Sequence, residues 1–390
     1  MILIRAARAG LACQTGARRI LAAGPIAVIL FLVGFSLSCG SSGRLTRQDH
    51  NAYVTLPGKG SVALLHINGT TGAISVGAET PQVIGTTPTA LALLPSKKFL
   101  YAVNSLDNTI SIFSVALDGT LNLTGSPIPV GGTGPVAAAI DPTGQYLLVT
   151  NAFTDNISVF SIDAGTGALS LVGSPVPANS NPSEILFTHS GKFVYITNPS
   201  LGQVTGFSFS NGVLVPVPNS PVLSGLGAFG LAVDSSDRFL YVANPSDPNP
   251  VVPTIGNISG FTIDPGSGQL TTILGSPFTV SNGTGPTVIA VDPNGRFVYA
   301  ITTGTSNSLW GFQINATNGQ LVPITGSPFS LTGGSVFALI DPDGDYLYIG
   351  SEQSNGIAAY TYDPSTGVPK AIVSSPFSTG TTPGGMVLSE

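Results

Sequence analysis

Glu184 is the side chain whose type and position in this sequence point most directly to chemistry. The chain repeats one pattern seven times, and the position of Glu184 is small or apolar in the other six copies. Those six residues are Ala90, Ala137, Gly230, Val288, Phe337 and Gly385. A single carboxylate among such neighbours could act as a general acid or base. The simpler interpretation, a solvated carboxylate at a channel mouth, stays open.

Four further acids are expected on the same face of the molecule as Glu184, together with the base Lys59. They are Asp107, Asp155, Asp247 and Glu352. If this face binds an ion, a cation such as calcium fits better than an anion, because Ca²⁺ prefers carboxylate oxygens. The alternative is that these acids are scattered loop residues that keep a weakly charged protein soluble. No other cofactor and no metal-ligand set is expected.

Nucleophilic and metal-based catalysis have little support in the sequence. His66 is predicted on the polar side of a strand and His189 in a turn on the opposite face, and both cysteines, Cys13 and Cys39, lie near the N-terminus. We find no Ser-His-Asp order, paired catalytic carboxylates, metal triad or glycine-rich phosphate loop. Carboxylates from different copies of the repeat could still converge in space.

These positions are assigned from a repeat that fills most of the chain. Its central markers are mostly 46 to 49 residues apart, with one step of 58. The markers are Tyr53, Tyr101, Leu148, Tyr195, Tyr241, Tyr299 and Tyr348. Periods near 45 residues that are built from short strands are typical of propeller blades, which must stack on neighbours to bury their faces.

Each copy holds four predicted strands. In the third copy, the apolar run Ala137–Ile140 precedes the turn Asp-Pro-Thr-Gly, whose Pro and Gly preset the turn dihedrals. Gln145–Thr150 and the alternating Ile157–Ile162 follow, and Ala168–Val172 is the outer strand. The prediction is an all-β, seven-bladed propeller with four antiparallel strands in each blade.

The two ends of the repeat array complement each other. Tyr53 has no innermost strand before it, whereas Thr382–Leu388 resembles an innermost strand with nothing after it. We expect the N- and C-terminal strands to pair in one blade, which removes two open sheet edges. The long insert Pro245–Asn257 is expected on the same face as Glu184, where extra loop length usually serves binding.

Residues 1–38 are predicted to be an export signal, because arginines precede the apolar run Ile20–Leu37 and small residues follow it. Similar ends occur in bacterial lipoproteins, so Cys39 is the predicted lipid-attachment site. Residues 39–51 would then be a polar tether, and residues 52–390 the propeller, in the extracytoplasmic cell envelope. Simple cleavage, giving a secreted or periplasmic protein, and a retained membrane helix stay open.

The charge balance argues against nucleic-acid binding. Four of the 13 basic residues and none of the 19 acids precede Cys39, so the remaining chain has nine basic residues and a net charge of −10. Such a chain lacks the basic stripe that nucleic acid requires. The expected partners are a small molecule, a glycan or a protein at the channel face, and the membrane through the lipid anchor. The protein is expected to be a monomer.

Three stretches carry a family resemblance: FVYITN at 193–198, FLYVAN at 239–244 and DPNGRFVYAIT at 292–302. They resemble YVTN-type repeats and the seven-bladed lactonase-like propellers related to bacterial 6-phosphogluconolactonase. The resemblance spans roughly residues 52–390 and implies a propeller with lactonase-type activity. That family often has Gly-Pro-Arg-His before the innermost strand, whereas residues 134–137, 181–184 and 285–288 lack both Arg and His. An anionic phosphosugar would therefore lack cationic partners.

The sequence supports a membrane-tethered binding or scaffolding module as the leading interpretation. The alternative is a lactonase-like hydrolase that acts on an uncharged lactone or sugar, with Glu184 as the acid/base. A calcium-stabilised structural propeller is a third. The channel lining distinguishes the first two, since a polar pocket around Glu184 would favour chemistry and a bare apolar funnel would favour a scaffold.

Overall fold

The computed structural model describes residues 47–80, 85–245, 256–280, 285–302, 307–331 and 333–389. These residues are mostly in β-strands, and the one helix among them is the short 3₁₀ turn η1 (Pro57–Lys59). No helix in these ranges is long and apolar enough to span a bilayer. Strand β1 begins at His50, so the end of the predicted tether already contributes to a sheet.

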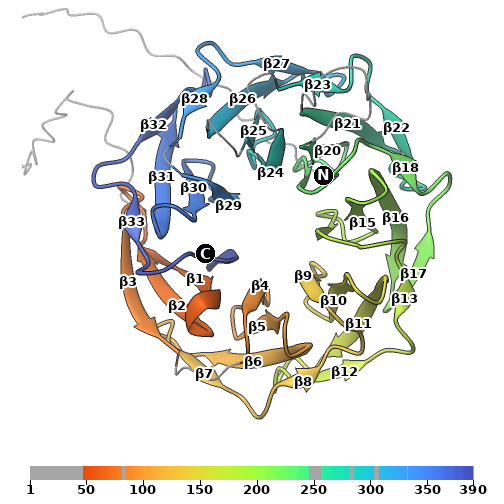
Figure 1. The fold of residues 1–390 in the computed structure, drawn as a ribbon, viewed down its shortest axis with the longest axis vertical. Coiled ribbons are helices and arrows are strands. Elements are labelled where there is room, and N and C mark those ends of the chain that lie inside the picture. Colours follow the sequence, from red (N-terminus) through yellow and green to blue (C-terminus); the bar gives the residue numbers. More distant parts are fainter. Residues whose placement is uncertain are drawn as a thin grey trace, which may run out of the picture. The chain divides into compact units, whose positions relative to one another are not determined.

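The described strands form seven antiparallel sheets, the blades, each starting at a central channel (Figure 1). The innermost strands of blades 1 to 7 are β34 (Met386–Ser389), β4 (Pro88–Leu93), β9 (Pro135–Ile140), β14 (Ile185–Phe187), β19 (Leu231–Val233), β24 (Pro286–Val291) and β29 (Ser335–Ile340). The second strands are β1 (His50–Leu56), β5 (Phe99–Asn104), β10 (Tyr146–Asn151), β15 (Phe193–Asn198), β20 (Phe239–Asn244), β25 (Phe297–Thr302) and β30 (Tyr346–Ser351).

The third and fourth strands complete each blade. The third strands are β2 (Ser61–Ile67), β6 (Thr109–Val115), β11 (Asn156–Ile162), β16 (Gln203–Ser210), β21 (Asn257–Ile263), β26 (Ser308–Ile314) and β31 (Gly356–Tyr362). The fourth are β3 (Ile74–Glu79), β7 (Leu121–Leu123), β12 (Leu169–Leu171), β17 (Val213–Pro216), β22 (Leu270–Thr272), β27 (Leu321–Pro323) and β32 (Pro369–Ala371). The predicted four-stranded, seven-bladed propeller is confirmed.

Blades 2 to 7 each add a fifth, two-residue strand that pairs with the start of the third strand. These strands are β8 (Ile128–Pro129), β13 (Val176–Pro177), β18 (Val222–Leu223), β23 (Phe278–Thr279), β28 (Phe329–Ser330) and β33 (Phe377–Ser378). Each follows the Ser-Pro pair of its blade. The sequence does not reveal them because two residues are too few to show a strand periodicity.

The ring is closed by the two ends of the chain. Strand β34 pairs antiparallel with β1, with Tyr53 opposite Val387 and Val54 opposite Met386. The backbone of Thr55 bonds to both Gly384 and Gly385, which extends the pairing toward the channel mouth. Innermost strands of successive blades contact each other all the way round, from β34 and β4 to β29 and β34. The predicted closure by N- and C-terminal strands is therefore confirmed.

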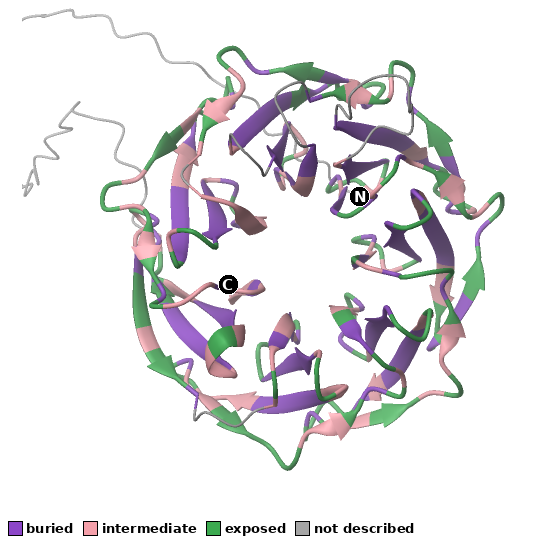
Figure 2. Cartoon of the chain, viewed as in Figure 1, coloured by how far each residue is buried: buried purple, intermediate pink, exposed green. Residues whose placement is uncertain are grey.

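The apolar core lies between blades rather than at the centre of the molecule. Each of the seven buried clusters draws its side chains from two adjacent blades, such as Tyr195 of blade 4 with Phe261 of blade 5. Burial is strongest along the second and third strands and weakest along the outer ones (Figure 2). A blade is thus a two-faced sheet that becomes stable only when both neighbours cover it.

The repeated tyrosine joins each blade to the next one. Its hydroxyl donates to a glycine carbonyl in the turn between the third and fourth strands of the following blade, as Tyr195 does to Gly268 at 2.7 Å. Gly268 has φ +72°, and a Cβ added there would lie 2.4 Å from Phe193 Cδ1. Only glycine tolerates this close aromatic contact and this dihedral. Leu148 takes the tyrosine position in blade 3 and has no hydroxyl.

Deleting residues 380–390 is expected to prevent stable folding. The deletion removes β34, which leaves β1 with an open edge and takes Met386 out of the cluster that blades 1 and 7 share. Thermal melting by circular dichroism and size-exclusion chromatography should show aggregation or a lost cooperative transition. A truncated protein that remains monomeric with an unchanged melting curve would contradict the closure argument.

Tyr195→Phe is expected to destabilise the protein by about 1–2 kcal/mol, because the buried carbonyl of Gly268 loses its donor. Chemical denaturation of the variant and the wild type measures the difference. The same substitution leaves the ring and its packing in place, so the loss reports on the hydrogen bond alone. A loss below about 0.5 kcal/mol would show that the interblade bond contributes little.

Candidate functional site

Each innermost strand has a β-bulge at the channel mouth. In blade 4, Ser183 and Glu184 both pair with Thr197. In blade 5, Phe229 and Gly230 pair with Ala243 in the same way. Blades 2, 3, 6 and 7 show the corresponding register shift. The residue after each bulge residue belongs to a set that we call the channel ring: Ala90, Ala137, Glu184, Gly230, Val288, Phe337 and Gly385. The structure thus places the seven aligned positions at one level.

A cavity of about 360 Å³ occupies this level of the channel. Six of the seven channel-ring residues line it, and most of the remaining lining is apolar. The other lining residues are Thr89, Leu91, Val136, Ala138, Ser183, Ile185, Phe229, Thr287, Ile289, Val336, Ala338, Leu339, Gly384 and Met386. Within the described part of the chain, Glu184 is the only ionisable side chain in this lining. The volume of the cavity suits a small molecule.

Glu184 is held by hydrogen bonds from two blades. Its Oε2 accepts the backbone N–H of Leu231 in blade 5 at 2.9 Å. Its own N–H donates to Thr197 Oγ1 at 3.1 Å, and that hydroxyl donates to the carbonyl of Phe229 at 2.8 Å. The carboxylate is therefore fixed between blades 4 and 5, with one oxygen bonded to the neighbouring strand.

The protein environment raises the pKa of Glu184 to about 7. Burial inside the ring is the main cause, because it disfavours the charged form, and the N–H of Leu231 acts in the opposite direction. Protein atoms surround the carboxylate on the ring side, whereas Glu184 as a whole is exposed to the channel. Glu184 can therefore exchange a proton with a molecule in the channel near neutral pH, as a general acid or base must.

The other predicted acids do not gather around Glu184. Asp107 Oδ2 accepts the N–H of Thr86, and Asp155 Oδ1 accepts the N–H of Asn181 at 2.7 Å. Glu352 is exposed in the β30–β31 loop of blade 7. Asp155 has φ +54°, so it serves as a left-handed turn residue that fixes the loop leading into blade 4. None of these three lines the channel cavity.

The remaining predicted positions either lie outside the described residues or have partners of their own. Asp247 and Cys39 lie outside the described residues. Lys59 pairs with Glu79 at 2.7 Å. His66 hydrogen-bonds to Asn51, and His189 to Asp237 in the neighbouring blade. No group of three or more His, Cys, Asp or Glu side chains that could hold a metal occurs among the described residues.

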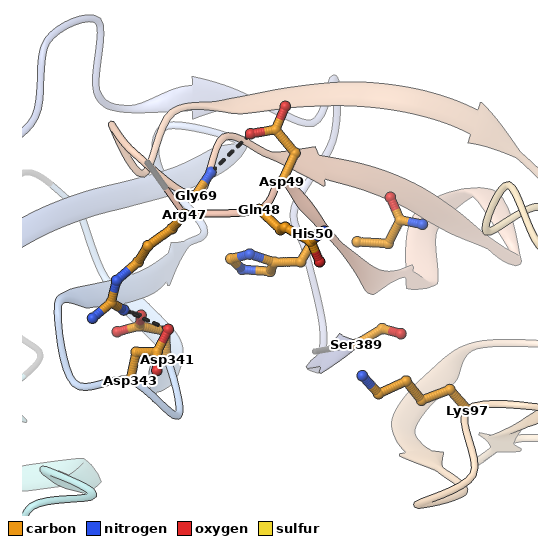
Figure 3. Close-up of a pocket in the computed structure, with 10 residues that line it drawn as sticks. Arg47, Gln48, Asp49, His50, Gly69, Lys97, Asp341, Asp343 and Ser389 are labelled. Atoms are coloured by element: carbon orange, nitrogen blue, oxygen red, sulfur yellow. Dashed lines mark hydrogen bonds and ion pairs between the residues drawn. The ribbon is translucent and has the colours of Figure 1, made fainter. Parts of the chain in front are cut away.

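A second cavity, of about 400 Å³, lies at the other end of the channel ring's strands, beside the turn between β29 and β30 (Figure 3). Arg47 Nη1 contacts Asp343 at 2.5 Å and Asp345 at 2.8 Å there. Burial raises the pKa of Asp341 in the same turn to about 6. The N–H groups of Tyr346 and Asp345, which bond to its carboxylate, act in the opposite direction. The charges are largely satisfied within the protein, so Arg47 binds the N-terminal segment to blade 7.

Sequence reasoning located Glu184 but missed what holds it. Leu231 contributes a backbone N–H, which no side-chain pattern reveals. Phe229 and Val136 line the cavity at the bulge positions, and Arg47 joins the start of the described chain to blade 7. Phe229 and Val136 directly precede channel-ring residues, so the alignment of the repeats could have identified them. The contacts of Arg47 depend on the closed ring.

Comparisons with known proteins agree with this architecture. A candidate 6-phosphogluconolactonase from Bacteroides uniformis has a TM-score of 0.74 and 20% identity, and the match covers 88% of this chain and 100% of that chain. A second one, from Bacteroides fragilis, has a TM-score of 0.73 and 21% identity over 89% and 99% of the two chains. The periplasmic gluconolactonase PpgL of Pseudomonas aeruginosa has a TM-score of 0.73 and 17% identity over 88% and 99%.

At these identities the solved structures support the fold. No curated protein matches the chain. The family model described as lactonase, 7-bladed beta-propeller, matches residues 44–181 and 258–382, which is more than half of the chain. The matched segments include β9, the innermost strand of blade 3, with its bulge, whereas Glu184 lies between the two segments. The chain therefore belongs to the lactonase family of seven-bladed β-propellers.

Proposed function

We propose that the protein is a lactonase-type hydrolase that acts on an uncharged lactone in the central channel. The observation that carries this proposal is the single carboxylate of Glu184, which Leu231 N–H holds at the wall of a cavity whose other side chains are mostly apolar, and whose pKa is raised to about 7. Membership of the lactonase propeller family supports a hydrolytic role. It also favours this function over the binding or scaffolding module that was the leading interpretation of the sequence.

The proposed step needs one general base and one water molecule. The carboxylate of Glu184 takes a proton from water as the water oxygen bonds to the lactone carbonyl carbon. The bond between that carbon and the ring oxygen then breaks, and the proton passes to the ring oxygen. Water is consumed and a hydroxy acid is released, so no further reactant is required. Leu231 N–H orients the base through Oε2 and leaves Oε1 for this proton transfer.

The substrate is proposed to be uncharged at this site. The described cavity lining contains no Lys, Arg or His side chain. A phosphate or carboxylate group beside Glu184 would lie near a like charge with no cation to offset it, which is costly in a partly buried site. The positions that carry Arg and His in related propellers are Val136 and Ala137 in blade 3. They can supply only apolar contact.

A binding module is the second candidate, and one observation favours it. Apart from Glu184, the cavity is lined mainly by alanine, valine, leucine, isoleucine and phenylalanine. Such a lining binds an apolar molecule without any chemistry, and Glu184 could then serve only to bond the backbone of Leu231. Turnover measurements on the wild type and on the variant Glu184→Gln separate these two functions.

Glu184→Gln is expected to lower kcat/KM on uncharged lactones by about 100-fold or more, because the amide cannot accept the proton. In the wild type, kcat/KM should rise with pH through about 7 as the carboxylate forms, and the variant should lack that rise. Acid release from γ- and δ-lactones, followed with a pH indicator, measures both. Glu352→Gln, an exposed acid on the same face, is the matched control and should stay active. Equal activity of Glu184→Gln and the wild type would contradict the proposal. A wild type that hydrolyses none of these lactones would favour the binding module.

The melting temperature offers an independent readout of the same carboxyl group. Its folded-state pKa is raised from 4.5 to about 7, so the wild type loses stability as the pH rises through this window. Glu184→Gln keeps an oxygen for Leu231 N–H and does not ionise. The variant should therefore melt above the wild type at pH 8, and the two should melt closer together at pH 5. A difference that is the same at both pH values would show that Glu184 does not titrate in this range.

A further inference from the structure

We propose that the lactone bound here carries an apolar chain, which packs against Phe229 and Val136 on either side of Glu184. The hydrolysis of that molecule rests on the proposed function, whereas its binding does not. The ligand class is thus a γ- or δ-lactone with an alkyl or acyl substituent, and a polyhydroxylated sugar lactone is disfavoured.

The first argument is the position of the two apolar side chains. Val136, Ser183 and Phe229 are the bulge residues of blades 3, 4 and 5, so the carboxylate of blade 4 has an apolar side chain in each adjacent blade. Both Val136 and Phe229 line the channel cavity, and they keep 36% and 43% of their surface exposed. Large apolar side chains that stay open beside a lone carboxylate form a surface that a bound molecule could cover.

The second argument is that the wall is rigid. Phe229 N–H donates to the carbonyl of Ala243 at 3.0 Å, and its carbonyl accepts the hydroxyl of Thr197. The same hydroxyl accepts the N–H of Glu184. One threonine thus fixes the backbones of the aromatic and acidic residues together, so that a molecule touching both meets a preformed site. Because the Phe229 ring is half-exposed, truncating it should not unfold the blade.

The third argument is that the apolar surface continues outward from the cavity. Phe153, which is 82% exposed, lies over Gly134, where an added Cβ would be 2.6 Å from the ring. Gly134 leads through Pro135 directly to Val136. Leu106 is 69% exposed at the position of Phe153 in blade 2, and Leu201 is 42% exposed in the corresponding loop of blade 4. A chain leaving the cavity past Val136 would therefore stay on apolar surface.

Few side chains of the cavity offer a polar group to a sugar. Besides Glu184, the described lining offers the hydroxyls of Ser183, Thr89 and Thr287. The hydroxyl of Thr89 already donates to the carbonyl of Val103, at 3.5 Å. A sugar lactone would depend on backbone groups of the innermost strands for most of its hydrogen bonds, whereas each buried methylene of an alkyl chain favours binding without a polar partner.

The test uses 2-pyrrolidinone and its 5-alkyl derivatives with chains of one to six carbons. These lactams resemble γ-lactones and resist hydrolysis, so binding is measured without turnover. Calorimetry on the wild type should give Kd values that fall by up to about fourfold per added methylene. Phe229→Ala should weaken the hexyl derivative by about tenfold and leave the parent lactam unchanged. Val136→Ala should act in the same direction with a smaller effect.

Leu274→Ala is the matched control, because Leu274 is 84% exposed on the outer edge of blade 5, and it should bind like the wild type. Melting curves confirm that each variant is folded. Kd values that do not depend on chain length, or a Phe229→Ala variant that keeps the full dependence, would overturn the inference.

Lactone hydrolysis by the same proteins separates the two proposals. Turnover that favours δ-gluconolactone over alkyl lactones would overturn this inference while the proposed function stands. Chain-dependent lactam binding without any lactone turnover would support the apolar site and overturn the proposed function.

Discussion

The fold depends on burial between neighbouring blades. A four-stranded sheet of this size has two apolar faces, and no helix in the described part of the chain covers either one, so each face needs another blade. All seven buried clusters are shared by adjacent sheets, and the tyrosine hydroxyls reach glycine carbonyls in the next blade. Because each blade packs only on its neighbours, the first and last blades would each keep one uncovered face if the ring did not close. That requirement explains why β34 and β1, from the two ends of the chain, share one sheet.

Closure also creates the site. Packing the blades around a ring leaves the inner edge of each innermost strand facing a channel, where backbone N–H groups have no strand to pair with. The N–H of Leu231 is bonded by Glu184 instead. The channel ring is therefore the level at which side chains can reach a molecule in the channel. In this chain a single carboxylate stands there, and burial against the ring raises its pKa.

The acids on the outer loops show the limit of reasoning from charge alone. Asp155 and Asp107 share a face with Glu184, yet each is engaged with a backbone N–H of a loop. Their carboxylates stabilise turns on separate blades. A repeat alignment gives the face on which a residue lies, whereas radial position and side-chain direction decide whether it reaches the channel. Glu184 reaches it because it directly precedes the innermost strand β14, and Asp155 does not because it lies in the loop between β10 and β11.

The sequence by itself determined the number of blades, the four-strand pattern, the closing strand and the singular position of Glu184. Those features are encoded locally, by turn residues, by alternation along each strand and by a marker that recurs at a fixed spacing. Only the tertiary structure decided that Thr197 links Glu184 to Phe229, that Leu231 supplies its hydrogen bond and that Arg47 bonds to blade 7. These contacts join separate strands or blades, so they exist only once the blades have packed, and the contacts of Arg47 require in addition that the ring is closed.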